Sequence, residues 1–169
     1  MSYTHFVGID NGISGSIGIV SPNGTAFIAT PTIKCKSYTK EEQNIHRIDW
    51  KELLKGLSDL PKDKTFVLME RPLVNPRAFK ATQSALRALE ATLICIEYNL
   101  LDFEYIDSKT WQREFISSAV IGHDEMKEAS MMVGLTLFPN NGMFIKRHKD
   151  ADGLLIAEYA RRKHLNLLK

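Results

Sequence analysis

Cysteine is scarce in this chain of 169 residues, and its scarcity excludes two classes of protein. The two cysteines, Cys35 and Cys95, fall in an expected loop and in the middle of an expected helix. They form neither the Cys/His spacing of a zinc site nor the framework of a disulfide-rich domain. We therefore expect two free thiols in a reducing compartment.

Long apolar runs are also missing, and so is a basic leader segment. No apolar stretch approaches the length that spans a bilayer, and Met1-Ser2-Tyr3 leads directly into an expected strand. The sequence therefore predicts an intracellular protein without a membrane partner.

An excess of charge of one sign is the third absence. The formal net charge is +2, which is too small to indicate a nucleic-acid partner by itself. Hydrophobic residues make up 44% of the chain and charged residues 25%, and these ordinary values exclude a disordered or collagen-like protein. The length suits a single domain over 1–169.

The order of segments predicts an α/β domain with a mixed sheet in a layered arrangement. We expect strands over 4–10, 14–21, 25–29, 65–70 and 103–106, and helices over 48–57, 79–99, 108–115, 124–134 and 150–163. Residues 30–46 lack clean periodicity, so we expect a mobile excursion there. In the long helix, the side chains of Leu86, Leu89, Leu93 and Ile96 should pack on the sheet.

Acidic residues stand where apolar segments end or begin. Asp10 closes the first strand, Glu70 closes the fourth, and Asp152 precedes the apolar start of the last helix. One such carboxylate is more often a solvated terminus, but three that adjoin different apolar elements can converge on Mg²⁺, which takes oxygen ligands. Without a partner, Glu70 would be costly at the end of a buried strand. We therefore predict a metal site.

The neighbours of these acids leave two questions open. The glycines after Asp10 let a backbone approach a phosphate, but Asn11-Gly12 also suits a tight hairpin turn. Before Asp152, His148 or Lys149 shares a helical face with it, whereas Asp150 reaches the same side only from a non-helical position. An aspartate at this point also caps a helix for structural reasons alone.

Three motifs together resemble those of the RuvC-type Holliday-junction resolvases. They are Gly8-Ile9-Asp10 with its glycine-rich turn, Leu68-Met69-Glu70-Arg71, and Asp152-Gly153-Leu154 at the start of the last helix. The divergent loops are more similar to those of a phage-type member of the family than to those of a typical bacterial member. The resemblance implies an RNase H-like fold, with a five-stranded mixed sheet flanked by helices. It also implies a homodimer, in the cytoplasm of a bacterial cell or phage-infected host, that uses Mg²⁺ to nick opposing strands of a four-way junction.

The resemblance also assigns roles to residues. It makes Asp10, Glu70 and Asp152 metal ligands, and places Lys149 where the family usually has an aspartate or histidine. The fourth ligand is then Asp150 or His148, and we favour Asp150 because an oxygen donor suits Mg²⁺ better than an imidazole. Lys109 is similar to a basic residue that the family keeps near the scissile phosphate, although an ordinary solvated lysine explains it equally well.

The chemistry of phosphodiesters suggests a mechanism for such a site. Two magnesium ions held about 4 Å apart by shared carboxylates would activate a water and stabilise the leaving 3′-oxygen. Asp10 is the natural bridging ligand, and Mn²⁺ is expected to substitute for Mg²⁺.

Basic residues cluster in two segments that contain few acids, which predicts binding to branched DNA through salt-sensitive phosphate contacts. These residues are Arg71, Arg77, Lys80 and Arg87 in one segment, and Lys146, Arg147, His148 and Lys149 in the other. Leu73, Phe79 and Tyr38 are candidates for wedging against unstacked bases, although core packing is the more ordinary role for Phe79. The long helix offers Ala81, Ala85, Leu89 and Ile96 either to a dimer interface or to packing on the sheet.

The sequence thus predicts a magnesium-dependent, structure-selective endonuclease that resolves Holliday junctions by paired nicks. One rival is an ATP-binding module of the actin and sugar-kinase type, whose phosphate loop the glycine-rich turn resembles, but that fold normally needs two such domains. Other rivals are an RNase H-like domain without activity that binds DNA or a partner protein, and a nuclease of the same fold that cuts RNA/DNA hybrids or replication forks.

Overall fold

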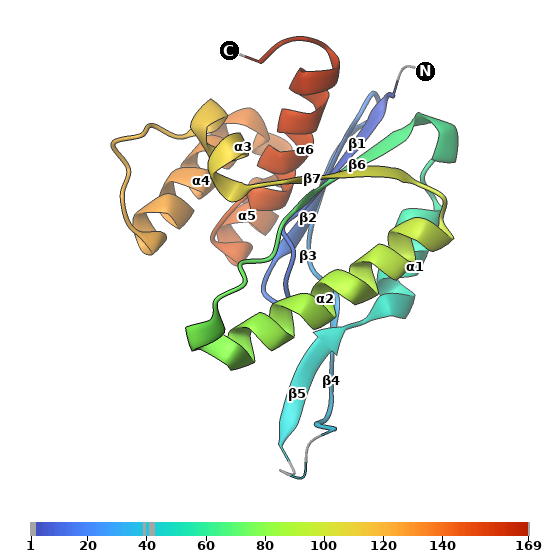
Figure 1. Cartoon of the computed structure of the whole chain (residues 1–169). Coiled ribbons are helices and arrows are strands. Elements are labelled where there is room, and N and C mark those ends of the chain that lie inside the picture. The colour runs from blue at the N-terminus through green and yellow to red at the C-terminus, as the bar shows by residue number, and fades with distance from the viewer. Residues whose placement is uncertain (1–2, 39, 41–42, 169) are drawn as a thin grey trace.

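The computed structural model of the chain describes residues 3–38, 40 and 43–168. Its strands are β1 (His5–Ile9), β2 (Ser16–Ser21), β3 (Gly24–Ala29), β4 (Thr32–Lys36), β5 (Asn44–Ile48), β6 (Thr65–Glu70) and β7 (Asp102–Ile106). Its helices are α1 (Trp50–Ser58), α2 (Phe79–Tyr98), α3 (Ser108–Phe115), α4 (His123–Leu137), α5 (Gly142–His148) and α6 (Asp152–His164), with short 3₁₀ turns at η1 (Lys62–Lys64), η2 (Pro76–Ala78) and η3 (Pro139–Asn141). Figure 1 shows their arrangement.

A five-stranded mixed sheet in the order β3-β2-β1-β6-β7 forms the centre of the molecule. Strand β2 runs antiparallel to β1 and β3, whereas β1, β6 and β7 run parallel to one another. The predicted α/β fold with a five-stranded mixed sheet is confirmed. Because β1 and β6 are covered on both faces, they consist of nearly unbroken apolar residues.

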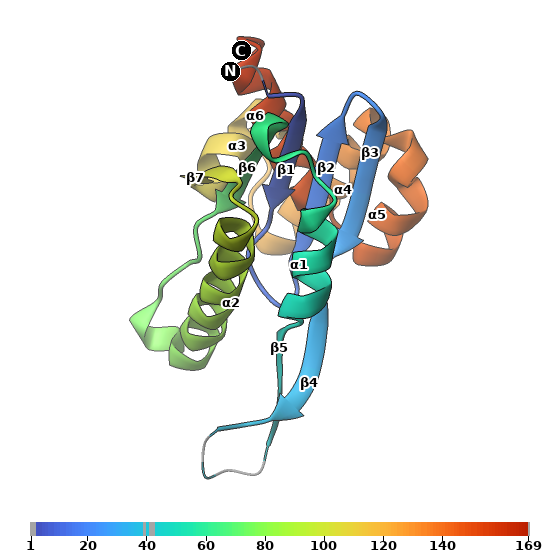
Figure 2. The same ribbon diagram turned by 90° about the vertical axis from the view of Figure 1, so that its right-hand side faces the viewer.

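Alternate side chains of the central strands enter two separate cores. Phe6, Phe66 and Leu68 join α6 and α3 on one face, and Val7 and Val67 join α1 and α2 on the other. Figure 1 shows the sheet nearly edge-on, with α3, α4, α5 and α6 on one side and α1 and α2 on the other, and Figure 2 shows it from the side of α1 and α2. The two-residue period of a strand is what assigns neighbouring side chains to opposite cores.

Glycines allow α6 to lie directly on the sheet. Gly8 and Gly18 are opposite each other in the β1–β2 pair, and α6 passes over both of them. A Cβ atom on Gly8 would overlap backbone atoms of Ala157 and Gly153, and one on Gly18 would overlap the backbone of Leu154. This backbone-to-backbone contact sets the depth at which α6 packs, and so the position of its first residue.

The expectation of an irregular excursion over 30–46 is wrong for most of that segment. Strands β4 and β5 form a separate antiparallel hairpin, with Thr32 opposite Ile48 and Lys36 opposite Asn44. Residues 39, 41 and 42 lie outside the described residues. Cys35 consequently lies in a strand rather than in a loop, and both cysteines are free thiols. Lysines between the apolar residues disguise the alternating strand pattern here.

Helix boundaries differ from the expected ones at the C-terminal end of the chain. Helix α5 was not predicted; it ends at His148 and is followed by Lys149, the C-cap residue, whose φ of 74° is left-handed. The last helix begins at Asp152 and not at 150, because Asp150 and Ala151 form the turn between α5 and α6.

The buried face of α2 also differs from the predicted one. Ala88, Thr92, Cys95 and Ile96 are its buried residues, and Leu89 and Leu93 are partly buried against the same core. Leu86 is exposed to solvent instead of packing on the sheet. Ile96 has no exposed surface and is therefore unavailable to a dimer interface.

We predict that Gly18→Ala lowers the free energy of unfolding by about 2–3 kcal/mol, because the added methyl group must push α6 away from the sheet. The matched control is Gly56→Ala in α1, where no atom lies near the added methyl group and helix propensity should raise stability by about 0.5–1 kcal/mol. Urea denaturation followed by circular dichroism measures both changes. Equal stability of Gly18→Ala and the native protein would show that α6 does not depend on this contact.

Candidate active site

Two of the predicted acidic residues lie at the same edge of the sheet. Strands β1 and β6 are parallel, and Ile9 is paired with Met69, so Asp10 and Glu70 follow at the carboxyl ends of adjacent strands. The backbone N–H of Asp10 donates to the Ser16 carbonyl, which holds the turn between β1 and β2 closed. The register of the sheet therefore brings these two side chains together across 60 residues of sequence.

Helix α6 supplies the third acidic residue and the turn before it supplies the fourth. Asp152 is the first residue of α6. Asp150 lies before the helix, in the non-helical position from which it was expected to reach the same side as Asp152. The N–H of Gly153 donates to Ser16 Oγ at 3.1 Å, which fastens the start of α6 to β2. The glycine contact and this hydrogen bond together position Asp152 beside the β1 edge.

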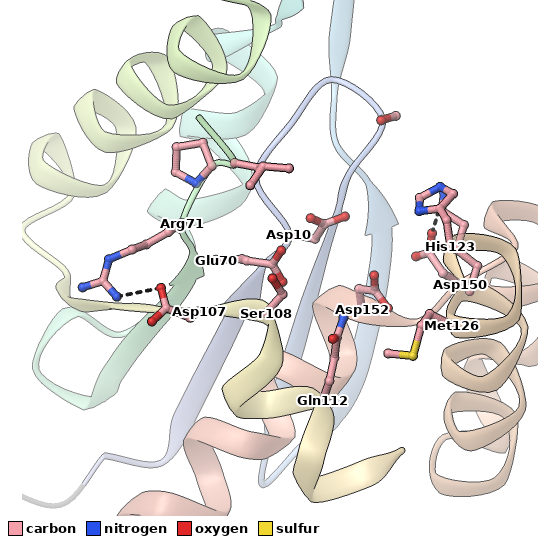
Figure 3. A pocket seen from close by; sticks show the side chains of 14 residues that line it. Asp10, Glu70, Arg71, Asp107, Ser108, Gln112, His123, Met126, Asp150 and Asp152 are labelled. Carbon is pink, nitrogen blue, oxygen red and sulfur yellow. Dashed lines mark hydrogen bonds and ion pairs between the residues drawn. The ribbon is translucent and has the colours of Figure 1, made fainter. Parts of the chain in front are cut away.

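All four carboxylates line one pocket of about 520 Å³. Figure 3 shows Asp10, Glu70 and Asp152 grouped together, with Asp150 toward α4. The rest of the lining comes from the β1–β2 turn, the segment after β6, the start of α3 and the first turns of α4: Ser14, Arg71, Pro72, Leu73, Asp107, Ser108, Gln112, His123, Met126 and Lys127. Acidic groups from three separate parts of the chain thus share one open cavity.

The carboxylates repel one another in this pocket. Burial, followed by the negative charges of Asp152, Glu70 and Asp150, raises the pKa of Asp10 well above its ordinary value, with the charge of His148 acting in the opposite direction. Burial and the charge of Asp152 likewise raise the pKa of Glu70, to about 7. The site thus disfavours its own negative charge and would gain free energy from a bound cation.

Trp111 holds Glu70 in position. Its indole N–H, on a ring with no exposed surface, donates to Glu70 Oε2 at 2.7 Å. This hydrogen bond, with a weaker one involving Ser108, partly offsets the effect of burial on the pKa of Glu70. This role of Trp111 was not predicted from the sequence. The signal was a tryptophan in a short amphipathic helix that follows the strand next to β6.

Ser130 does the same for Asp152. Its hydroxyl donates to Asp152 Oδ1 and accepts the N–H of Ala151 at 3.1 Å, so one buried side chain of α4 fixes the turn before α6. Burial and the charge of Asp150 raise the pKa of Asp152 to about 6, although the Ser130 hydrogen bond and the charge of Lys127 oppose this shift. No local pattern in the sequence marks Ser130.

Asp150 is almost completely buried, at 2% exposure, and lies between two cationic partners. His148 Nδ1 is 3.0 Å from Asp150 Oδ1, and Lys127 Nζ is 3.7 Å from Asp150 Oδ2. His148 Nε2 also donates to the carbonyl of Gly15 at 3.0 Å, so both of its ring nitrogens are engaged. The hydrogen bond to Asp150 raises the pKa of His148, which favours an imidazolium that donates from both nitrogens.

This donor set suits a hard divalent cation. Asp10, Glu70, Asp150 and Asp152 offer carboxylate oxygens, which are the ligands that Mg²⁺ and Mn²⁺ prefer, and His148 is occupied by hydrogen bonds. Within the part of the chain that the structure describes, no three His, Cys, Asp or Glu side chains already stand as a metal-binding group. Burial, together with mutual repulsion, raises the pKa of three of these carboxyl groups, and a bound cation would offset both effects.

The predicted basic residues lie at different places around this pocket. Arg71 lines it, donates to Asp107 Oδ1 at 3.1 Å and lies over the ring of Tyr105. Lys109 is exposed on α3 and lines an adjacent cavity rather than the carboxylate pocket. The others are divided between the segment around η2 and α2, with Arg77, Lys80 and Arg87, and α5 with its C-cap, with Lys146, Arg147 and Lys149.

The three residues predicted to wedge against unstacked bases, Leu73, Phe79 and Tyr38, are all exposed. Leu73 borders the carboxylate pocket with 82% of its surface exposed, and Phe79 begins α2 with 70% exposed. Core packing is therefore wrong as the role of Phe79. Tyr38 is also exposed and lies in the hairpin region under the guanidinium of Arg87.

Comparisons with known proteins identify the fold. No protein-family model and no curated protein sequence matches this chain. Among solved structures, it is similar to T. thermophilus RuvC in complex with a Holliday junction substrate, with a TM-score of 0.55, 14% identity and 99% of each chain covered. A second structure of Thermus thermophilus RuvC matches with a TM-score of 0.48, 14% identity, and 95% and 97% of the two chains covered. The chain therefore has the RNase H-like fold of RuvC. No helix of the described residues could cross a membrane.

We predict that Asp152→Asn raises the stability of the metal-free protein at pH 8 by about 2 kcal/mol. The folded pKa of about 6 lies above the unfolded value of 3.8, so Asp152 costs the native protein stability as the pH rises from 4 through 6. Urea denaturation in EDTA at several pH values should show the advantage of the variant shrinking below pH 6. A variant no more stable than the native protein at pH 8 would contradict the repulsion, and Asp63→Asn on the exposed turn η1 is the control.

Proposed function

We propose that this protein is a magnesium-dependent, structure-selective endonuclease that resolves Holliday junctions and related branched DNA by paired nicks. The observation that carries the proposal is the position of Asp10, Glu70, Asp150 and Asp152 around one pocket of an RNase H-like fold. The similarity to T. thermophilus RuvC, solved with a Holliday junction substrate, supports branched DNA as the substrate class.

The roles of the carboxylates follow from their positions. Asp10, Glu70 and Asp152 would hold the cation, and Asp10 is the carboxylate whose pKa the charges of Asp152, Glu70 and Asp150 raise in addition to burial. Bound there, Mg²⁺ would activate a water for in-line attack on phosphorus and stabilise the leaving 3′-oxygen. Trp111 and Ser130 hold two of the carboxylates at fixed positions, so little reorganisation is needed when the substrate arrives.

Asp150 has two roles open to it. Its first role would be that of the fourth metal ligand, as predicted from the sequence. Its second role is structural: it pairs with His148, which in turn donates to the Gly15 carbonyl, so the α5–α6 turn is tied to the β1–β2 turn. Lys127, which contacts Asp150 from α4, is a cation close enough to the pocket to approach a bound phosphate. Lys109, one helical turn from Gln112 of the pocket wall, remains a candidate for the same contact.

DNA binding would use the basic and exposed apolar groups around the pocket. Arg71 adjoins Glu70 and would contact the phosphate backbone, while Leu73 and Phe79 would pack against unstacked bases beside the cleavage site. The cations Arg77, Lys80 and Arg87 on one segment and Lys146, Arg147 and Lys149 on the other would contact the arms of the junction. Paired nicks require two active sites, so a homodimer is part of the proposal, as is the phage-type assignment.

The ATP-binding alternative is not favoured, because a solved structure that covers 99% of the chain is a RuvC. An RNase H-like domain without activity would not need Asp10, Glu70 and Asp152 held in a buried pocket against their mutual repulsion. Cleavage assays on four-way junctions, replication forks and RNA/DNA hybrids, each with Mg²⁺ or Mn²⁺, distinguish the remaining substrates.

We predict that Asp10→Asn lowers the rate of junction cleavage by about a thousandfold or more, because a shared metal ligand loses its charge. Folding should be preserved, as judged by circular dichroism, and junction binding should remain. The control variant Asp63→Asn removes an exposed carboxylate from η1 and should cut at the native rate. A folded Asp10→Asn protein that cuts four-way junctions at the native rate would refute the assignment.

We also predict that Mg²⁺ binding strengthens as the pH rises from 5.5 to 8 and releases protons. The pKa values of about 7 for Glu70 and about 6 for Asp152 mean that both are partly protonated near pH 6.5, and a cation must displace those protons. Calorimetry in two buffers with different heats of ionisation measures the protons released. The same affinity at pH 5.5 and pH 8 would argue against carboxylate ligands with raised pKa values.

A further inference from the structure

A second cavity lies beside the hairpin and shares no lining residue with the carboxylate pocket. It has a volume of about 400 Å³ and lies between the β4–β5 hairpin, the start of α1 and the middle of α2. Its lining combines two aromatic residues, Tyr38 and Trp50, with the cations Arg47 and Arg87. Among the described lining residues, Glu90 is the single acidic one. We call this cavity the hairpin groove.

The aromatic groups of the hairpin groove are held by named contacts. The guanidinium of Arg87 lies 5.5 Å from the centre of the Tyr38 ring, and the Nε atom of Arg87 is buried without a hydrogen-bond acceptor among the described residues. Trp50 is 49% exposed, yet its backbone is anchored because its carbonyl accepts from Cys95 Sγ of α2 at 3.5 Å. Trp50 therefore presents a half-exposed ring on a backbone tied to α2, with Lys51 Nζ 5.7 Å from the ring centre, and Arg87 nearby has an Nε atom without an acceptor among the described residues.

The hairpin extends the positive charge beyond the cavity. His46 lines the groove, and Lys34 is directly opposite it in the β4–β5 pair, so both side chains point to the same side of the hairpin. Lys36 is two residues further along β4 and therefore shares that side. Figures 1 and 2 show that this hairpin projects beyond the five-stranded sheet, alongside α2.

The hairpin groove and the carboxylate pocket meet at the β1–β2 turn. Ile13 of this turn lines the groove and Ser14 lines the carboxylate pocket. The side-chain N–H of Asn11 donates to the Ala85 carbonyl at 3.3 Å, which ties the same turn to α2. The two cavities are therefore neighbours, separated by the β1–β2 turn.

We propose that the hairpin groove binds one nucleotide of the DNA outside the cleaved step, with its base stacked on Trp50 and its phosphate against Arg47 and Arg87. Aromatic stacking suits any base, and arginine provides two donors to a phosphate in one plane. This inference rests on the proposed function, because it assigns part of the same substrate to a second site.

The first test removes the two arginines. Arg47→Ala/Arg87→Ala should weaken binding to a fluorescent four-way junction by about tenfold in EDTA, and should reduce the slope of log affinity against log salt by about two. The matched control is Lys62→Ala/Lys64→Ala on η1, which removes two exposed cations remote from both cavities and should leave affinity and slope nearly unchanged. Anisotropy titrations from 50 to 300 mM salt give both quantities.

The second test addresses stacking. Trp50→Ala should weaken binding by about tenfold with an unchanged salt slope, because a neutral ring is lost. Tyr98→Ala is the control, since it removes an exposed aromatic ring at the far end of α2. Trp50 and the fully buried Trp111 are the two tryptophans, so junction binding should quench the emission of the native protein and not that of Trp50→Phe.

The outcomes separate this inference from the proposed function. Groove variants that bind the junction as tightly as their controls, while the native protein binds and cuts it with Mg²⁺, overturn the groove alone. A native protein that neither binds nor cuts junctions overturns both. If the groove variants instead become monomeric in sedimentation while their controls remain dimeric, the groove holds a second copy of the chain and the nucleotide assignment is wrong.

Discussion

The close packing of α6 on the β1–β2 pair is the constraint on which the site depends. Gly8 and Gly18 leave no side chain between the strands and the helix, so the backbone of α6 rests on the sheet. Asp152 begins α6 and Asp10 ends β1, and this contact brings them to one pocket. A bulkier residue at either glycine would displace α6 and, with it, Asp152. The same helix–sheet contact therefore determines both the stability of the fold and the position of this carboxylate.

That packing brings buried carboxylates close together, which costs the folded protein electrostatic free energy. The surrounding groups reduce this cost but do not remove it. Trp111 and Ser130 donate hydrogen bonds to Glu70 and Asp152, and Lys127 lies beside Asp150. Even so, the pKa values of Asp10, Glu70 and Asp152 stay raised. A site that keeps carboxylates in such positions is typical of one built for a positively charged ligand, since burial without a partner only costs stability.

Local pattern predicted most of the fold and the acidic residues of the site. The apolar strands over 4–10 and 65–70 and the acids at their ends were visible because burial on both faces produces unbroken apolar runs. The supporting residues Trp111, Ser130 and Lys127 were missed, since their roles arise only when α3 and α4 pack beside the sheet. The hairpin was missed because Ile48 is the one residue of its two strands that enters a core, and exposed strands carry polar residues that hide their alternation.

The most direct test of the account is a crystal structure of the protein soaked in Mn²⁺, with the ion located by its anomalous scattering. The account predicts manganese bound by oxygens of Asp10 together with Glu70 and Asp152, and it predicts His148 still hydrogen-bonded to Asp150 and Gly15 rather than bound to the metal. Manganese bound elsewhere, or bound in this pocket without Asp10, would contradict the account.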